Sequence, residues 1–389
     1  MNYLEKLMED IEVQWMSLGD VAKVQRGASP RPIAKFITDD ENGVPWIRIG
    51  DTSPNLKYVN SSEQKITHEG ARNSRVLKKG DFILSNSMSF GRPYILNIDG
   101  AIHDGWASIS EFGNKLNSDY LYHYLSSDLV QNYWLSKINS GSVSNLNADI
   151  IKSLQIPIPP LEIQQKIVAI LDKFAELTAE LTAELTAELT NRKKQYKFYR
   201  DRLLSFDERN SDWQYLEFLA ENLDSKRRPV TSGLRESGSI PYYGASGIVD
   251  YVKDYLFDGD FLLVSEDGAN LIARNTPIAF SVSGKSWVNN HAHILKFETY
   301  AERKFVEYYL NSIDLTPYIS GAAQPKLNQR NLNSIKIPNP TYEEKVIIVS
   351  ILDKFDTLTT SISEGLPKEI ELRKKQYEYY RDMLLSFPK

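Results

Sequence analysis

The chain has 389 residues, of which 41% are hydrophobic, 25% are charged and none is cysteine. The lack of cysteine excludes disulfides and thiolate metal sites and fits a reducing compartment. The formal net charge of −5 excludes a surface that coats nucleic acid everywhere, although it leaves room for a local basic groove. The charged start MNYLEKLMED and the lack of a long apolar run predict neither a signal peptide nor a membrane span.

Residues 1–155, the first front, have the pattern of a β-rich domain. Short apolar runs such as VPWIRIGD (44–51) and GDFILSN (80–86) are separated by Gly, Asn, Asp and Ser. A helical stretch, YLYHYL, follows at 120–125.

Residues 156–208, the first tail, have the pattern of one long helix. Pro159 and Pro160 mark its start, and apolar residues then recur at steps of three and four, as on the contact face of a coiled coil. The residues expected to pack against a second helix are Ile167, Ile170, Phe174, Leu177, Leu181, Tyr196, Tyr199 and Leu203.

The tetrapeptide AELT occurs four times in succession at 175–190, inside this helix. It contains no Gly or Pro, and all its residues except Thr are good helix formers. Changing the number of repeats would therefore change the helix length in steps of four residues. The alternative is replication slippage, tolerated on a solvated helix whose glutamates form a ladder of like charge.

Residues 209–336, the second front, share the organisation of the first front. The GDF run of 80–82 recurs at 259–261, and a helical stretch recurs at 305–310. Two fronts that share a fold but differ in their exposed residues suit the recognition of two different targets.

Residues 337–389, the second tail, repeat the first tail at a constant offset of 181. The stretches 192–206 and 373–387 agree at 12 of 15 positions. Thr341 and Glu344 predict a capping box, and the segment Glu364–Pro367 predicts an interruption of the helix. The matching packing residues are Ile348, Ile351, Phe355, Leu358, Ile362, Tyr377, Tyr380 and Leu384.

Two matched apolar stripes in one chain most simply pack against each other. We therefore predict an α+β fold with two β-rich domains, separated by two long antiparallel coiled-coil helices and related by a pseudo-twofold internal repeat. The stripes by themselves fit a generic scaffold coiled coil equally well.

Motifs for catalysis are incomplete. Gly-Lys-Ser at 284–286 lacks the earlier glycine of a P-loop, because position 279 is Ala. The stretch 339–342 (NPTY) is similar to a methyltransferase motif, but it aligns with the proline start of the first helix. His291 and His293 lack a convincing third ligand, so we expect them to line a polar surface and not to bind a metal. We predict no catalytic, cofactor or metal site.

The repeated tails, with their IPxPP start, ILDKF and RKKQYxxYRDxLLSF, resemble the two repeated regions of the specificity subunit of type I restriction–modification systems. TAEL repeats between the recognition domains are a feature of one subgroup of that family. The stretches WMSLGDVAKVQRGASP (15–30) and IPYYGASGIVDYV (240–252) resemble parts of its two target-recognition domains. The resemblance covers nearly the whole chain. It implies recognition domains at 1–155 and 209–336, and conserved spacer helices at 156–208 and 337–389.

The resemblance also implies a function and partners. Each recognition domain would read one half of a bipartite, asymmetric site in double-stranded DNA. The helices would set the spacer and dock two methyltransferase subunits, and two restriction/translocase subunits would join that core. S-adenosylmethionine, ATP and Mg would belong to those partners and not to this chain, and the complex would be cytoplasmic in a bacterium or archaeon. The competing hypothesis is a non-catalytic coiled-coil adaptor with two β-rich protein- or ligand-binding modules.

Candidate DNA contacts follow from the chemistry of the major groove. Arg suits guanine, Asn and Gln suit adenine, Ser and Thr adapt to either, and basic residues elsewhere hold phosphates. The candidates in the first front are Arg26, Ser29, Arg31, Lys35, Asn86, Ser87, Ser89 and Arg92. Those in the second front are Lys226, Arg227, Arg228, Tyr242, Tyr243, Ser246, Asn289, Asn290 and His291. A further basic cluster, expected at the DNA backbone, is Arg72, Arg75, Lys78 and Lys79.

Overall fold

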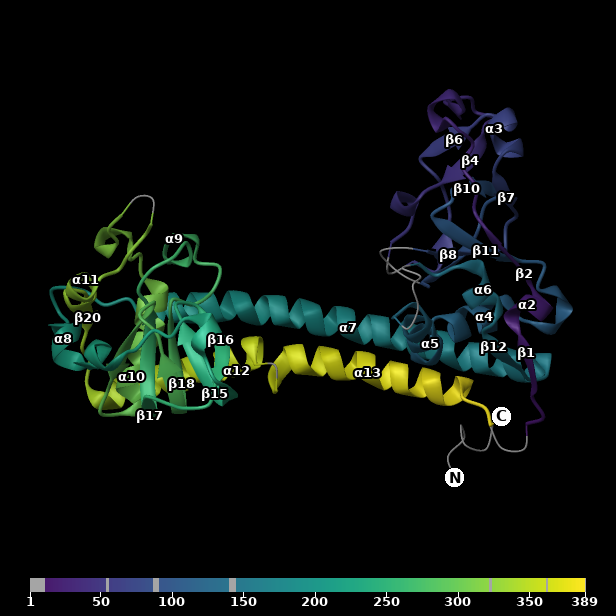
Figure 1. The fold of residues 1–389 in the computed structure, drawn as a ribbon. Helices are drawn as coiled ribbons and strands as arrows, with labels where there is room; N and C mark the ends of the chain where they lie inside the picture. Colours follow the sequence, from purple (N-terminus) through teal and green to yellow (C-terminus); the bar gives the residue numbers. More distant parts are fainter. Residues whose placement is uncertain are drawn as a thin grey trace. The chain divides into compact units, whose positions relative to one another are not determined.

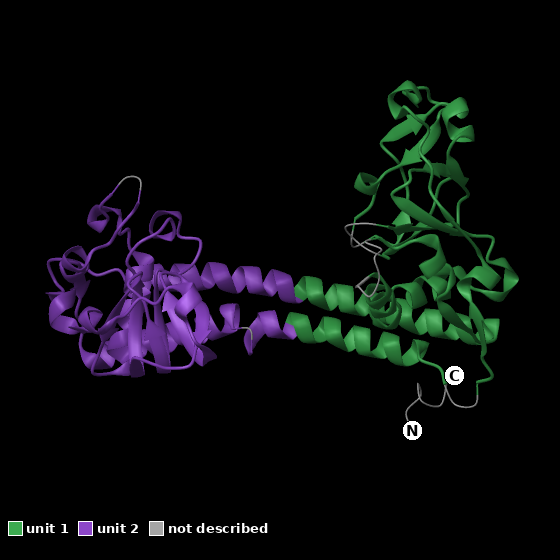
Figure 2. Ribbon diagram, in the orientation of Figure 1, with its two compact units in different colours: residues 1–184, 370–389 green, residues 185–369 purple. Residues whose placement is uncertain are grey.

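The computed structural model describes residues 11–53, 56–86, 91–139, 145–321, 324–361 and 363–388. It contains two compact units (Figure 2). Unit 1 comprises residues 1–184 and 370–389, and unit 2 comprises residues 185–369. The units are defined by packing, whereas the four segments expected from the sequence are defined by repetition, and the boundaries of those segments stay a prediction.

Unit 1 contains two five-stranded sheets and a two-stranded ladder (Figure 1). The first sheet has the order β2 (Lys23–Arg26), β11 (Trp106–Ser110), β8 (Phe82–Ser85), β9 (Pro93–Leu96) and β5 (Tyr58–Val59). The second has the order β3 (Ile37–Thr38), β6 (Gln64–Ile66), β4 (Val44–Ile47), β10 (Gly100–Ile102) and β7 (Arg75–Leu77). The ladder joins β1 (Gln14–Ser17) to β12 (Gln155–Ile158).

Helices complete unit 1. They are α2 (Leu18–Val21), α3 (His68–Arg72), α4 (Ser118–Leu125), α5 (Asp128–Asn139) and α6 (Ala148–Lys152), with short 3-10 turns η1 (Ile33–Lys35), η2 (Ile49–Asp51) and η3 (Gly113–Lys115). Strand β8 shows how the core is divided. Its residues alternate between two clusters, with Phe82 and Leu84 packed on the helical side and Ile83 in a separate cluster with Ile47. Because side chains alternate across a strand, a strand covered on both faces is apolar throughout.

Unit 2 contains one six-stranded sheet and a two-stranded ladder. The sheet has the order β14 (Glu221–Asn222), β19 (Ala292–Lys296), β17 (Phe257–Ser265), β18 (Ala279–Val288), β15 (Ser237–Gly244) and β16 (Gly247–Val252). The ladder joins β13 (Trp213–Tyr215) to β20 (Lys336–Pro338). The helices are α8 (Leu216–Leu219), α9 (Asn270–Ala273), α10 (Tyr300–Ser312) and α11 (Gln329–Asn333), with η4 (Asp224–Lys226), η5 (Ser232–Leu234) and η6 (Thr316–Tyr318).

The two units repeat one order of elements. In each, the ladder strand β1 or β13 leads into a one-turn helix, and the next strand pairs as β2-β11-β8 or as β14-β19-β17. In each, a short helix and the second ladder strand come just before a long helix. The α+β class and the internal repeat expected from the sequence are therefore confirmed.

Helices α7 and α12 begin where the sequence indicates. Helix α7 (Leu161–Leu203) begins directly after Pro160 and runs through all four AELT repeats. Helix α12 (Tyr342–Thr360) begins with a capping box, in which the Glu344 carboxylate accepts from the Thr341 backbone N–H at 2.9 Å. Helix α12 ends at Thr360 and helix α13 (Gly365–Leu385) begins at Gly365, so residues 365–367 of the segment expected to interrupt the helix are helical and the break comes just before them. Pro367 lies in the first turn of α13, where a helix needs no N–H donor.

Within unit 1, α7 and α13 pack antiparallel. The ring centroids of Phe174 and Tyr380 lie 5.4 Å apart, and Ile167 and Leu384 are fully buried in the same core. Within unit 2, Tyr196 and Tyr199 stack on Phe355 with centroids 6.1 and 5.5 Å apart.

The other expected packing residues vary in burial. Ile348 is buried, Ile170 and Leu203 are partly buried against the unit cores, and Leu181 and Tyr377 line a groove with Leu177. Ile351 and Leu358 are half-buried, whereas Leu177 and Tyr199 stay 47% and 42% exposed. Ile362 lies outside the described residues. The prediction missed four fully or nearly fully buried leucines, namely Leu171, Leu204, Leu352 and Leu385.

Among the described residues, no helix is long and apolar enough to cross a membrane.

Candidate nucleic-acid interface

In each unit, most of the described candidate DNA contacts lie where neighbouring strands of the sheet begin or end. In unit 1 this place is formed by the end of β2, the end of β8 and the start of β11, where Arg26 pairs with Ala107 and Ser85 with Trp106. In unit 2 it is formed by the corresponding end of β17 and start of β19, where Ser265 pairs with Ala292, and by the turn after β14. We call these two places the strand-end sites.

Two glycines shape the strand-end site of unit 1. Gly27 donates its N–H to the carbonyl of Trp106 at 2.8 Å, and a Cβ on Gly27 would lie 1.9 Å from the carbonyl oxygen of His103. A Cβ on Gly105 would lie 2.4 Å from the His103 ring. Only glycine fits at either position without displacing the turn formed by residues 103–105.

His103 supports this turn from inside. Its Nδ1 accepts the N–H of Gly105 at 2.8 Å, and its ring lies about equally far from Trp46 and Trp106, with centroids 6.2 and 6.0 Å away. Burial lowers the pKa of His103, and only part of this effect is offset by the nearby Asp104. The ring is therefore neutral at neutral pH, which suits a supporting role.

Asp104 brings four of the candidate residues together. Ser29 donates to its Oδ1 at 2.8 Å, and Arg31 Nη2 lies 3.7 Å from its Oδ2. Arg26 and Asn86 donate to its backbone carbonyl at 3.1 and 3.5 Å. The Ser29 hydrogen bond holds the pKa of Asp104 below its usual range. The prediction from sequence missed Asp104 because it sought donors for DNA and ignored the acceptors that orient those donors.

The remaining candidates of unit 1 are more dispersed. Lys35 ends η1 and is exposed, and Arg92 is half-buried just before β9. Of the second basic cluster, Arg75 Nε donates to the Arg26 carbonyl at 3.5 Å and so adjoins the site. Arg72 ends α3, Lys78 pairs with Asp99 at 2.8 Å, and the Lys79 N–H donates to the same Asp99 carboxylate. Ser87 and Ser89 lie outside the described residues.

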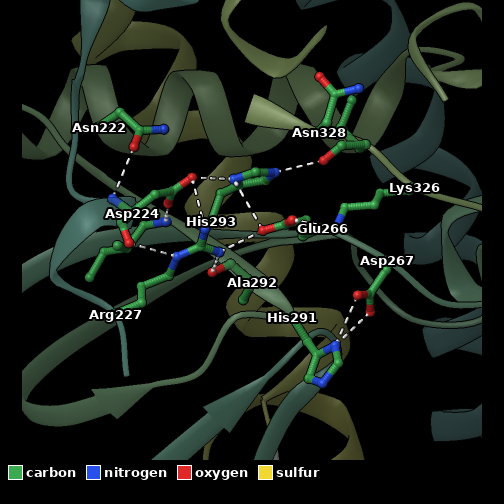
Figure 3. A network of polar contacts seen from close by, with 12 residues as sticks. Asn222, Asp224, Arg227, Glu266, Asp267, His291, Ala292, His293, Lys326 and Asn328 are labelled. Carbon is green, nitrogen blue, oxygen red and sulfur yellow. Dashed lines mark hydrogen bonds and ion pairs between the residues drawn. The ribbon is translucent and has the colours of Figure 1, made fainter. Parts of the chain in front are cut away.

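The strand-end site of unit 2 covers a largely buried cluster of ionisable side chains, which we call the Glu266 network (Figure 3). Its members are Asp224, Arg227, Glu266, His293 and Lys326. Arg227 Nη1 lies 2.7 Å from Glu266 Oε2, Lys326 Nζ lies 3.0 Å from Glu266 Oε1, and His293 Nδ1 lies 2.5 Å from Asp224 Oδ2.

Electrostatics holds both acids of the network in the charged form. Burial by itself would raise the pKa of Glu266, but the hydrogen bonds from Arg227 and Lys326 outweigh burial and leave the pKa below its usual value. Burial likewise opposes ionisation of Asp224, and His293, the Ile294 N–H and Arg227 together lower the pKa of Asp224.

Asp224, Glu266 and His293 have the residue types of a metal site, and their ligand atoms lie within 4.8 Å of one another. However, Arg227 and Lys326 already balance the two carboxylates. His293 also has both ring nitrogens engaged, because Nε2 lies 2.7 Å from the carbonyl oxygen of Leu327. The arrangement fits an ion-paired network better than a metal centre. The sequence offered no convincing acidic third ligand for the histidine pair, but the structure places Asp224 and Glu266 beside His293. These acids come from distant parts of the chain.

The two histidines therefore differ. His293 is completely buried, which contradicts the expectation that it lines a surface. His291, just before β19, is exposed and pairs through Nδ1 with Asp267 at 2.9 Å.

Burial also corrects three DNA-contact candidates in unit 2. Tyr242 is 1% exposed, its hydroxyl accepts from the Val230 N–H at 3.0 Å, and Asn289 is 6% exposed with its Oδ1 accepting from the His291 N–H. Arg227 belongs to the Glu266 network. A contact to DNA needs an exposed donor, so we reassign these three to supporting positions. Exposed candidates are Lys226, Arg228, Ser246, Asn290 and His291, and Tyr243 is half-buried beside Phe280.

Comparison with known proteins identifies the class. The sequence profile described as the type I restriction modification DNA specificity domain matches twice, over residues 10–191 and 210–372. The chain therefore belongs to the family of type I restriction–modification specificity subunits, which provide DNA sequence specificity.

Named relatives agree with this assignment. The chain is 33% identical to the EcoR124I/EcoR124II specificity subunit of Escherichia coli, over 100% of this chain and 98% of that protein. It is 31% identical to the EcoprrI specificity subunit of Escherichia coli, over 94% and 92%. The crystal structure of the HsdS subunit from Thermoanaerobacter tengcongensis shares the fold, with a TM-score of 0.57 at 18% identity over 96% of this chain and 95% of that chain. A chain from a structural study of complex assembly and conformational transition of the type I R-M system has a TM-score of 0.68 at 17% identity, over 97% and 98%.

Proposed function

We propose that each strand-end site reads one half of a bipartite, asymmetric DNA sequence. The observation that carries this proposal is that equivalent strand ends present different polar side chains in the two units. Unit 1 presents Arg26, Ser29, Arg31 and Asn86, and unit 2 presents Lys226, Arg228, Asn290 and His291. A shared frame with different polar side chains suits two unrelated half-sites, because base identity is read by the pattern of donors and acceptors.

The helical tails have a separate role in this proposal. The residues repeated at an offset of 181 offer two equivalent surfaces, which two copies of one methyltransferase subunit can occupy. Two restriction/translocase subunits join through that core. The AELT repeats in α7 support membership of the subgroup with such repeats, where we expect their number to set the spacer between half-sites.

We further propose that the chain is non-catalytic and works in the bacterial or archaeal cytoplasm. S-adenosylmethionine, ATP and Mg then act in the partner subunits. The purified chain should transfer no methyl groups, hydrolyse no ATP and cleave no DNA, and robust methyl transfer by the chain alone would overturn this part.

Selection from random duplex DNA tests the main proposal. The chain, assembled with its methyltransferase subunits, is used to enrich duplexes, and the enriched pool is sequenced at two salt concentrations. We expect two blocks of fixed sequence separated by an unspecified spacer, with affinity that falls as salt rises. Failure to enrich any sequence would favour a coiled-coil adaptor that binds proteins or ligands.

A further inference from the structure

We propose that the Glu266 network consists of positioning residues that determine how accurately unit 2 reads its half-site. This inference rests on the proposed function. The network members themselves are largely buried, so they would act through the exposed residues beside them.

The network ties together four segments that are distant in sequence. Asp224 and Arg227 come from the turn after β14, Glu266 follows β17, His293 is in β19, and Lys326 comes just before α11. Backbone hydrogen bonds join the same segments, since the Leu327 N–H donates to the Glu266 carbonyl at 2.7 Å and the Glu266 N–H donates to the His291 carbonyl at 2.9 Å.

At the centre of the network, the carboxylate of Glu266 and the ring of His293 each have a partner on both sides. Both carboxylate oxygens of Glu266 hold a cation, and Arg227 Nη1 also donates to the Ala292 carbonyl at 2.7 Å. His293 faces the Asp224 carboxylate on one side and the Leu327 carbonyl on the other, and neither group can donate a hydrogen. Both ring nitrogens of His293 are therefore engaged within the network.

Because most of its side chains are buried, the Glu266 network holds its geometry rigidly. The side chains of Asp224, Arg227, Glu266 and His293 are between 0% and 12% exposed. Buried pairs are weakly screened by salt, and loss of one partner leaves an uncompensated charge. The surface pair between Lys253 and Glu236, with side chains 66% and 74% exposed, has neither property.

The buried members are connected to exposed candidate contacts. Lys226 and Arg228 flank Arg227, and Asn290 and His291 precede His293. Half-buried Asp267, which follows Glu266, pairs with His291. Asp267, His291 and Lys326 line a cleft of about 760 Å³. A backbone shift that breaks the network must therefore move these side chains, and direct readout tolerates little movement.

The test compares two matched substitutions in the complete complex with methyltransferase subunits. Glu266→Gln removes the charge at the network centre. Glu307→Gln removes an equally buried acid of the same unit, since the side chains of Glu266 and Glu307 are 11% and 13% exposed, and Glu307 pairs with Lys304 on α10. Selection from random DNA and thermal unfolding are measured for both variants.

We expect Glu266→Gln to weaken discrimination by about fivefold or more at one or more base pairs of one half-site, within the usual cost of a mismatch. The other half-site should stay unchanged, and Glu307→Gln should lower the melting temperature without changing the selected bases. Equal base preferences in the two variants would overturn the inference. If the wild-type complex selected no sequence, the proposed function itself would fail.

A milder variant covers the case in which Glu266→Gln does not fold. Lys326→Gln removes one arm of the network from a side chain that is 51% exposed. A positioning role predicts altered base preference in one half-site. A mere phosphate contact predicts a uniform loss of affinity and a salt dependence reduced by about one charge, and that result would count against the inference.

Discussion

The ring of Phe174 packs against the ring of Tyr380, with centroids 5.4 Å apart. The residues equivalent to these two, at an offset of 181, are Phe355 and Tyr199, and their rings lie 5.5 Å apart. The same contact is thus made once in each unit. In both cases one residue comes from the first tail and the other from the second.

Removing either phenylalanine should destabilise the unit that contains it. Phe174→Ala loses one aromatic pair and Phe355→Ala loses two, each with part of the buried area, so we expect a loss of about 2–3 kcal/mol. Leu234→Ala is the control, because Leu234 is 77% exposed and its truncation should cost about 0.5 kcal/mol or less. Urea unfolding followed by circular dichroism measures the three variants. A loss no larger for Phe174→Ala than for Leu234→Ala would contradict the packing.

Gly27→Ala should damage one half-site. The new Cβ would collide with the carbonyl oxygen of His103 and displace the turn that carries Asp104. We expect a stability loss of about 1–3 kcal/mol, as for other overpacked positions, and relaxed base preference in one half-site only. Gly50→Ala is the control, because a Cβ on Gly50 would have no atom within 4 Å. Unchanged selection by the Gly27→Ala complex would remove the 103–105 turn from the reading surface.

The neutral state of His103 predicts a dependence of stability on pH. Its folded-state pKa is lowered from the ordinary value of 6.5 by burial. As pH falls below about 6.5, the unfolded chain binds a proton that the folded chain excludes, so the free energy of unfolding decreases until the pH passes the lowered pKa.

The measurement is thermal unfolding of unit 1 between pH 7.5 and 5, for the wild type and for His103→Asn. Asparagine can still accept the Gly105 N–H but does not titrate. The difference in melting temperature between the two proteins should therefore shrink as the pH is lowered. A difference that is constant over this range would show that His103 does not contribute to the dependence.

Deletion of one AELT unit, residues 183–186, should shorten the spacer by one base pair and leave the bases read unchanged. Four residues of helix correspond to about 6 Å and about 40° of rotation, close to the twist of roughly 34–36° per base pair of B-DNA. Deleting only one residue would turn the apolar stripe by about 100° and should damage folding instead. Mapping of methylated sites compares the proteins. An unchanged spacer in the AELT deletion would favour slippage on a solvated helix.

Exchange of residues 1–155 for the front of another family member should change one half-site and preserve the other. Distant sites without shared contacts behave almost independently. The methylated sites of the chimaera and the parent provide the measurement, and the parent with residues 209–336 exchanged is the reciprocal control. A change in both half-sites after one exchange would contradict modular reading.

The tails were predictable because their signals are local. The prolines before Leu161, the capping box at Thr341 and the interruption before Pro367 depend on residues a few positions apart. The prediction of the buried helix faces was less accurate, because Leu171 and Leu352 are fully buried although neither belongs to the expected apolar stripe. An apolar stripe locates the buried face of a helix only to within about one residue. Near the ends of the helices, the β-rich fronts also cover residues beside the stripe, which widens the buried face there.

The sites were harder to predict because their chemistry depends on distant pairs. Asp224 and His293 are 69 residues apart in sequence and meet only because β14 pairs with β19. Arg227 looked like a DNA contact from its type and its basic neighbours, and its acidic partner Glu266 lies 39 residues away. Residue type indicates what a side chain can bind, whereas the sheet register determines what it meets.

The first tail by itself contains both members of the repeated aromatic contact, Phe174 and Tyr199. In the full chain their partners are Tyr380 and Phe355, which are the equivalent residues of the second tail. Two copies of a fragment ending near residue 208 could therefore make both contacts with each other, with Phe174 of each copy against Tyr199 of the other. Such an association would be isologous and closed. It would carry one specificity twice, so its target would be a palindrome.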